Sequence, residues 1–104
     1  MVKEISDQDF EDEVIKSELP VLVDMWAPWG GPCQRIAPLV EKFSKEFEGK
    51  LKCCRLNVDE NSETAMKYQA MSIPLLLFFK DGQNVDESLG AVPEGVRSGP
   101  RSRH

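Results

Sequence analysis

The feature that most constrains the fold is an apolar strand pattern that leads through a tight turn directly into a helical pattern. Residues 21–27 are Val-Leu-Val-Asp-Met-Trp-Ala, a nearly continuous apolar run typical of a central parallel strand covered on both faces. The turn 28–33 follows, and apolar residues then recur at helical spacing from Ile36 to Phe47. Together these segments predict an α/β fold with Cys33 near the start of a helix.

The position of Cys33 points to thiol chemistry. A helix N-terminus presents free N–H groups and a partial positive charge, and both stabilise a thiolate. A Cys-x-x-Cys pair at such a turn is typical of a redox site, but here the first position of the pair is Gly30. Because burial opposes the helix effect, we expect Cys33 to be a slowly reacting thiol.

Asp24 interrupts the apolar strand, and burial of an unpaired carboxylate there would be costly. One interpretation is a structural aspartate near the strand end, tied to a lysine or to water. The other is a carboxyl group with a raised pKa beneath the site, able to accept a proton.

Length, charge and cysteine count limit the class of protein. The 104 residues suit a single domain, and the net charge of −5 argues against nucleic acid or an anionic membrane as a partner. No apolar run is long enough for a bilayer, and residues 1–4 do not begin a signal peptide. Three cysteines do not suit a secreted disulfide framework, so we expect a reducing compartment. Cys53 and Cys54 are adjacent in a predicted strand and should face opposite sides as buried fillers.

The rest of the chain predicts further strands and helices. Strands are expected at 2–5, 51–58, 75–79 and 84–89, the last two joined by an Asp81-Gly82 hairpin turn. Ser6 or Asp7 is expected to cap one helix, and Asn61 or Ser62 a second that ends near Tyr68. The pattern stops after Pro93, so we expect a domain over 1–93 and a disordered or non-native tail over 94–104.

From Met1 to about Pro93 the chain resembles thioredoxin, in the style of bacterial cytosolic or plastid m-type members. The order strand, helix, strand, helix, strand, helix, hairpin is that of the family. The motifs that carry the resemblance are Val21 to Trp29, Gly31-Pro32-Cys33, Ile36-Ala37-Pro38, Leu56-Asn57-Val58-Asp59, Ser72-Ile73-Pro74 and Gly90-Ala91. Two departures stand out: Gly30 replaces the first cysteine of Trp-Cys-Gly-Pro-Cys, and the C-terminal helix of the family is missing.

The resemblance implies a thioredoxin fold, with a mixed five-stranded sheet of order 1-3-2-4-5 whose last two strands are antiparallel to the others. It implies that Cys33 is the second, resolving cysteine, that Asp24 is the buried acid, and that Gly30 marks the lost nucleophile. It also implies an apolar substrate groove around a cis-proline, formed by Trp29, Gly31, Pro32, Ile73, Pro74, Gly90 and Ala91. It implies neither a cofactor nor a metal. The expected partners of a monomeric protein are protein substrates or extended peptides and thioredoxin reductase, in the cytoplasm or, for a mature m-type chain, the plastid stroma.

Three functions are compatible with these residues. Thiol–disulfide exchange needs one thiolate to open a mixed disulfide and a second thiol to resolve it, so a protein-disulfide reductase with Gly30 would be impaired or inactive. The alternative is a redox-silent module that binds extended peptides in the groove beside Pro74. In a third, minor interpretation, Cys33 joins two chains as a dimer contact or a ligand of a shared metal or iron–sulfur cluster.

Overall fold

The computed structural model describes residues 2–89. Its elements, in chain order, are β1 (Lys3–Ile5), η1 (Glu11–Ile15), β2 (Val21–Trp26), α1 (Gly31–Glu46), β3 (Lys52–Asn57), α2 (Ser62–Lys67), β4 (Leu75–Lys80) and β5 (Gln83–Leu89). The predictions for Gly90, Ala91, the tail 94–104 and the missing C-terminal helix fall outside the described residues.

The strands form one five-stranded sheet in the order β1-β3-β2-β4-β5, as expected. β1 and β2 each pair parallel with β3, whereas β4 pairs antiparallel with β2. The expectation that both last strands oppose the others was wrong for β5. The hairpin at Asp81 and Gly82, whose φ angles are 53° and 79°, reverses the chain again. β5 is therefore antiparallel to β4 and runs in the direction of β2.

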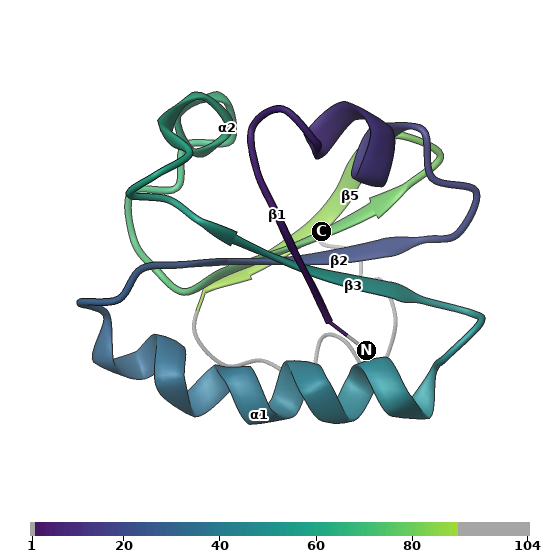
Figure 1. Cartoon of the computed structure of the whole chain (residues 1–104), viewed down its shortest axis with the longest axis horizontal. Coiled ribbons are helices and arrows are strands. Elements are labelled where there is room, and N and C mark those ends of the chain that lie inside the picture. Colours follow the sequence, from purple (N-terminus) through teal and green to yellow (C-terminus); the bar gives the residue numbers. More distant parts are fainter. Residues whose placement is uncertain (1, 90–104) are drawn as a thin grey trace.

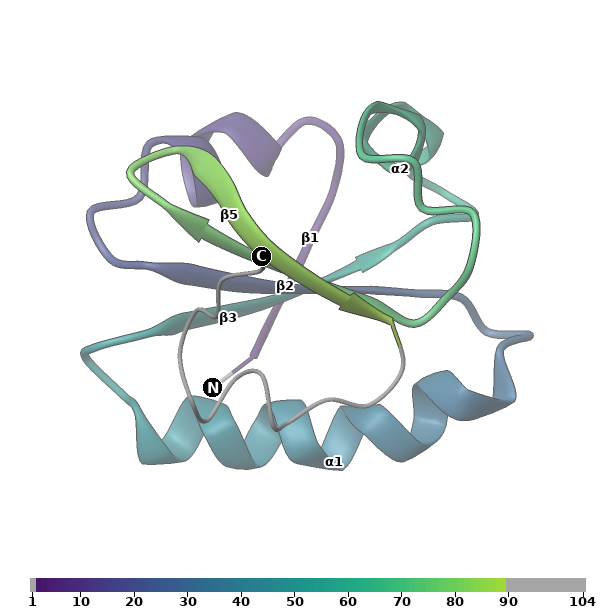
Figure 2. The same cartoon turned by 180° about the vertical axis from the view of Figure 1, so that it is seen from behind.

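Helices cover both faces of the sheet, as Figures 1 and 2 show from opposite sides. α1 lies along one face, while η1 and α2 lie on the other. The α1 side is packed by Leu22, Ile36, Val40, Cys53 and Leu76. The opposite side is packed by a larger cluster that includes Phe10, Val23, Cys54 and Phe79. Because Cys53 and Cys54 belong to different clusters, the two thiols face opposite sides of the sheet, as predicted.

Ser6 caps the turn that leads into η1, because its hydroxyl accepts from the N–H of Asp9 at 3.3 Å and its own N–H donates to the Asp9 carboxylate at 3.2 Å. The cap of α2 differs from the expectation. Asn61 precedes α2 but makes no side-chain cap, because its amide bonds to the backbone of Asp7 and Asn57 instead. The carboxylate of Asp7 accepts hydrogen bonds from the N–H groups of Glu63 and Thr64 at 3.2 and 2.9 Å. Asp7 therefore caps α2, across the fold from its own segment, rather than the helix that follows it in sequence.

Candidate functional site

The site lies where β2 ends and α1 begins. The N–H of Gly30 donates to the carbonyl of Ala27 at 3.1 Å, and the N–H of Cys33 donates to that of Gly30 at 3.0 Å. Gly30 is the extended N-cap residue of α1 and offers no side chain to the free N–H groups. Cys33 is in the first turn and is 1% exposed.

The side chains of Cys33 and Ile73 lie next to the position that the Cβ of a residue 30 side chain would occupy. A Cβ at position 30 would lie 2.9 Å from Cys33 Sγ and 3.0 Å from Ile73 Cδ1. In a disulfide, the Cβ of one cysteine lies about 3.0 Å from the sulfur of the other. The backbone at position 30 is therefore placed as the first cysteine of a 30–33 disulfide would be. The side chain of Ile73 thus lies beside the space that a residue 30 side chain would occupy.

The loop before β4 brings Ile73 and Pro74 to this turn. The Ile73–Pro74 peptide bond is cis, as the resemblance implied, and Pro74 is buried while Ile73 is half-buried. β4 begins at the next residue, where Leu75 pairs with Met25 of β2. The pairing of β4 with β2 thus holds the loop 71–74 against the end of β2.

Trp29 stands out from the surface at this turn. It is 67% exposed, and its indole N–H donates to both carboxylate oxygens of Asp59, at 3.0 and 2.9 Å. This pair fixes the direction of a large apolar ring while most of that ring faces solvent. Met71, two residues before Ile73, is 88% exposed. Exposed aromatic and methionine side chains are common at protein-binding surfaces.

Asp24 lies under the turn in the middle of the sheet and is 0% exposed. Its Oδ2 accepts a 3.3 Å hydrogen bond from Nε of Arg55, which is its parallel neighbour on β3. Its Oδ1 has no hydrogen-bond partner among the described residues. The guanidinium of Arg55 also stacks 4.3 Å above the Trp26 ring, and the Trp26 indole donates to Glu4. The partner of Asp24 is thus an arginine, where the sequence suggested a lysine or water.

The environment of Asp24 raises the pKa of its carboxyl group to about 6. Burial is the largest cause, because it disfavours the charged form, and the attraction of Arg55 only partly opposes it. The raised pKa agrees with that part of the second interpretation of Asp24, whose role as a proton acceptor stays a prediction. Burial likewise raises the pKa of Cys53 and of Cys54 to about 11, so both stay protonated and unreactive.

A cleft of about 600 Å³ lies on the α1 side of the turn. Its walls include Trp26, Pro28, Cys33, Pro38 and Arg55. Ile73 and Pro74 do not line it, so it is separate from the surface on which Trp29 and Pro74 were predicted to bind a peptide.

Sequence analysis did not anticipate Arg55 or Asp59. The two strands were predicted and expected to be neighbours, but their register was not. Once the register of β2 against β3 is known, it identifies Arg55 as the neighbour of Asp24.

Within the part of the chain that the structure describes, no group of three or more His, Cys, Asp or Glu side chains could hold a metal ion. The same described part contains no helix long and apolar enough to cross a membrane. Of the predicted site residues, the structure brings Gly30, Cys33, Ile73 and Pro74 together, with Gly31 and Pro32 exposed on the first turn of α1. Asp24 lies beneath this group, inside the sheet.

Comparison with known proteins agrees with this geometry. The Thioredoxin family model matches residues 1–98. A thioredoxin of Synechocystis sp. is 54% identical over 91 residues, which cover 88% of this chain and 85% of that protein. A thioredoxin of Haemophilus influenzae is 46% identical over 93 residues, 89% of this chain and 87% of that protein.

A chloroplastic M-type thioredoxin of Pisum sativum is 50% identical over 97 residues. That match covers 93% of this chain but 56% of the pea protein. A family model that spans nearly the whole sequence, together with relatives near half identity, leaves one assignment: the chain belongs to the thioredoxin family.

Proposed function

We propose that this thioredoxin-family protein binds extended segments of other proteins beside Trp29, Ile73 and Pro74 but does not complete dithiol exchange. The observation that carries the proposal is the absence of a side chain at Gly30. Exchange needs an attacking thiolate and a resolving thiol, and Cys33 is the single cysteine at this turn. The two other cysteines are buried in separate clusters of the sheet and cannot replace the missing nucleophile.

Burial of Cys33 supports the same conclusion. Cys33 is 1% exposed, so neighbouring side chains cover its sulfur. A substrate disulfide would have to displace this cover before it could reach Sγ. A monothiol reaction that starts at Cys33 is therefore disfavoured by access as well as by the absence of a resolving partner.

The binding surface is supported by groups that do not depend on Gly30. The cis peptide before Pro74, the exposed ring of Trp29 and its hydrogen bonds to Asp59 are all in place. We infer that Gly90 and Ala91 complete this surface, as the resemblance implies. The partners would be protein segments, the chain would be monomeric, and thioredoxin reductase would be the reductant of an active form. The relatives favour the cytoplasm or the plastid stroma.

The decisive experiment is an insulin reduction assay in dithiothreitol, which compares the protein with Gly30→Cys and Gly30→Ser. Cysteine restores the nucleophile at a backbone position that suits a 30–33 disulfide, so Gly30→Cys should increase turnover by at least 100-fold, the order of magnitude that a missing catalytic group costs. Serine has nearly the same size but no thiol, and Gly30→Ser should stay at the rate of the unmodified protein. Equal turnover of the unmodified protein and Gly30→Cys would refute the proposal.

Binding is tested separately with a peptide that cannot exchange disulfides. Carboxymethylated insulin B chain, labelled with a fluorophore, should increase in anisotropy on titration with the protein. Trp29→Ala should weaken that binding several-fold, because truncation of an exposed aromatic anchor typically costs 1 kcal/mol or more. Phe47→Ala removes an exposed aromatic residue from the far end of α1 and should leave the affinity unchanged. Absence of any anisotropy change would remove the binding half of the proposal and leave the redox half intact.

A further inference from the structure

A second cleft lies at the opposite end of the molecule from Cys33. It occupies about 460 Å³ between the beginning of β1, the end of α1 and the beginning of β3. Figure 1 shows these three segments meeting at the end of α1 that is farther from the β2–α1 turn. The volume falls within the range of small-molecule sites in proteins. None of the residues that form the candidate site at Cys33 lines this cleft.

The wall of this cleft carries a polar group that has no protein partner. Ser44 of α1 lines the cleft and is 2% exposed, and its hydroxyl makes no hydrogen bond to any described residue. A helical serine commonly bonds back to the carbonyl one turn earlier, but Ser44 does not. A buried hydroxyl without a partner is costly, and such groups call for a specific explanation. The Ser44 hydroxyl is therefore available to a molecule in the cleft.

The remaining walls are largely apolar. Val2, Leu19 and Leu51 contribute aliphatic side chains, and Cys53 is buried beside them. Because the raised pKa of Cys53 keeps its thiol protonated, Cys53 acts as a neutral apolar contact. A ligand here would bury apolar surface against these walls and make one hydrogen bond to Ser44.

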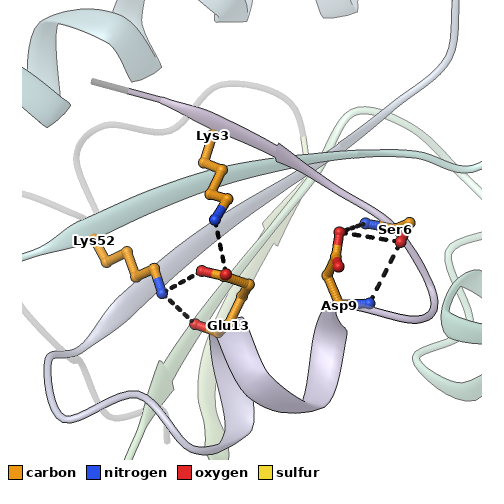
Figure 3. Close-up of polar contacts among 5 residues, drawn as sticks. All are labelled: Lys3, Ser6, Asp9, Glu13 and Lys52. Atoms are coloured by element: carbon orange, nitrogen blue, oxygen red, sulfur yellow. Dashed lines mark hydrogen bonds and ion pairs between the residues drawn. The ribbon is translucent and has the colours of Figure 1, made fainter.

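The two lysines of the cleft direct their charges to the other face of the sheet. Lys3 and Lys52 both line the cleft, but their ammonium groups reach Glu13 of η1, on the face opposite α1 (Figure 3), with N–O distances of 2.7 and 2.6 Å. Lys52 also donates to the carbonyl of Glu13 at 2.9 Å. Glu48 is an exposed carboxylate on the rim. The two ammonium groups are thus paired away from Ser44 and the carboxylate of Glu48 stays in water, so the buried walls favour an uncharged ligand.

We propose that this cleft, named here the Ser44 cleft, binds a small uncharged organic molecule that carries one hydroxyl or carbonyl group. The apolar part of the ligand lies against Val2, Leu19 and Leu51, and its polar group bonds to Ser44 Oγ. The site is independent of the proposed function, because none of its contacts depends on Gly30, Cys33 or Pro74.

Phenol and toluene form a matched pair of probes, since a methyl group replaces the hydroxyl at nearly constant size. Each is titrated into the full-length ¹⁵N-labelled protein at pH 7 and followed by amide chemical shifts. Phenol should shift the amides of Ser44, Gly49, Leu51 and Cys53 in one saturable process. In Ser44→Ala, phenol should bind about 3- to 10-fold more weakly, the typical loss of one hydrogen bond, while toluene affinity stays constant or rises.

Ser62→Ala is the control, because it makes the same substitution at the exposed start of α2 on the other side of the sheet. It should change neither affinity. Ser44→Ala should fold at least as stably as the unmodified protein, since it removes an unsatisfied buried group. Saturable shifts with neither probe would overturn the proposal and leave ordered water as the partner of Ser44. Equal phenol affinity in the unmodified protein and in Ser44→Ala would overturn it too.

Discussion

Glu13 and Asp24 are two carboxylates that both meet cations from neighbouring strands, yet their pKa values move in opposite directions. Glu13 lies between Lys3 and Lys52, with N–O distances of 2.7 and 2.6 Å, and its side chain is 23% exposed. The hydrogen bonds from Lys3 and Lys52 lower its pKa to about 2. Asp24 is 0% exposed, has one cation at 3.3 Å, and its pKa rises to about 6.

The difference shows which effect dominates at each place. Glu13 keeps its contact with water, so two short ion pairs act on it with little opposing cost of burial. Asp24 has lost its water entirely, and one long contact with Arg55 cannot replace it. The ion pairs of Glu13 therefore hold η1 against β1 and β3 (Figure 3). The charge of Asp24, in contrast, is buried under the candidate site and is unfavourable there. A fold keeps such a charge at a cost in stability, and functional sites are where raised carboxyl pKa values concentrate.

The largest expected effect is that of Asp24→Asn, which keeps an acceptor for Arg55 and removes the charge. The folded state binds the Asp24 proton more tightly than the unfolded chain, whose aspartate pKa is about 3.9. The charged carboxylate thus destabilises the fold increasingly from about pH 4 to pH 6 and fully above it. Asp24→Asn should raise the free energy of unfolding at pH 7.5 by about 2 to 3 kcal/mol, and this gain should vanish near pH 4.

Urea denaturation from pH 4 to 8 measures this difference. Asp12→Asn is the matched control, because Asp12 is an exposed carboxylate whose side chain is 77% exposed and pairs weakly with Lys16 at 3.7 Å. It should change stability by less than about 0.5 kcal/mol. A lower stability of Asp24→Asn at pH 7.5 would mean that Asp24 and Arg55 form a net stabilising ion pair, and the contrast with Glu13 would fail.

Arg55→Gln tests the ion pair between Asp24 and Arg55 from the side of the arginine. Loss of the guanidinium removes the attraction that opposes burial, so the pKa of Asp24 should rise further above about 6. At pH 8 the stability should fall by about 1.5 kcal/mol, the scale of a hydrogen bond to a charged group. Carboxyl ¹³C shifts of Asp24 report the pKa directly. In the Asp24→Asn background, Arg55→Gln should lower the free energy of unfolding much less, and what remains should be the lost stacking on Trp26. An equal loss in both backgrounds would show that Asp24 and Arg55 are not coupled.

Glu13→Gln tests the other carboxylate. Because the folded pKa of Glu13 is depressed to about 2, its contribution is present above the unfolded value of about 4.3 and disappears as the pH falls toward 2. The lysines are partly exposed and screened by water, so we expect a loss of about 1 kcal/mol at pH 7. Thermal unfolding at pH 7 and pH 2.5 measures it. Glu18→Gln is the control, at an exposed position without an ion pair among the described residues, and should not change the stability. A loss of stability in Glu13→Gln that persists at pH 2.5 would contradict an electrostatic origin.

Much of the fold could be predicted because it is encoded locally. The apolar runs from Val21 and from Leu75 specify buried strands, and Asp81-Gly82 specifies the hairpin between β4 and β5. The order of the strands and the cis peptide before Pro74 came from family resemblance. The predicted direction of β5 was wrong, although the hairpin implied the correct one. Because β4 is antiparallel to both β2 and β5, β5 must run in the same direction as β2.

The site could be predicted only as a list of residues. Asp24 and Arg55 are 31 positions apart, and their contact depends on the register of β2 against β3. A shift of one residue would have turned Arg55 to the other face of the sheet. The cap of α2 by Asp7 and the bond from Trp29 to Asp59 join segments far apart in sequence in the same way. Ser44 gave no signal, because a serine inside an amphipathic helix does not reveal whether its hydroxyl finds a partner.

The smallest expected effect is that of salt, and it separates the two carboxylates most cleanly. At 1 M NaCl the Debye length is about 3 Å, so charges in contact with water are screened while a charge inside the sheet is not. The stability difference between the unmodified protein and Glu13→Gln should therefore shrink by a few tenths of a kcal/mol between 0.05 and 1 M NaCl at pH 7.5. The difference for Asp24→Asn should stay the same within error. General effects of salt on burial of apolar surface act on all variants alike and cancel in these differences. If the Asp24→Asn difference shrank as much as that of Glu13→Gln, water would have access to Asp24, and burial could no longer explain its raised pKa.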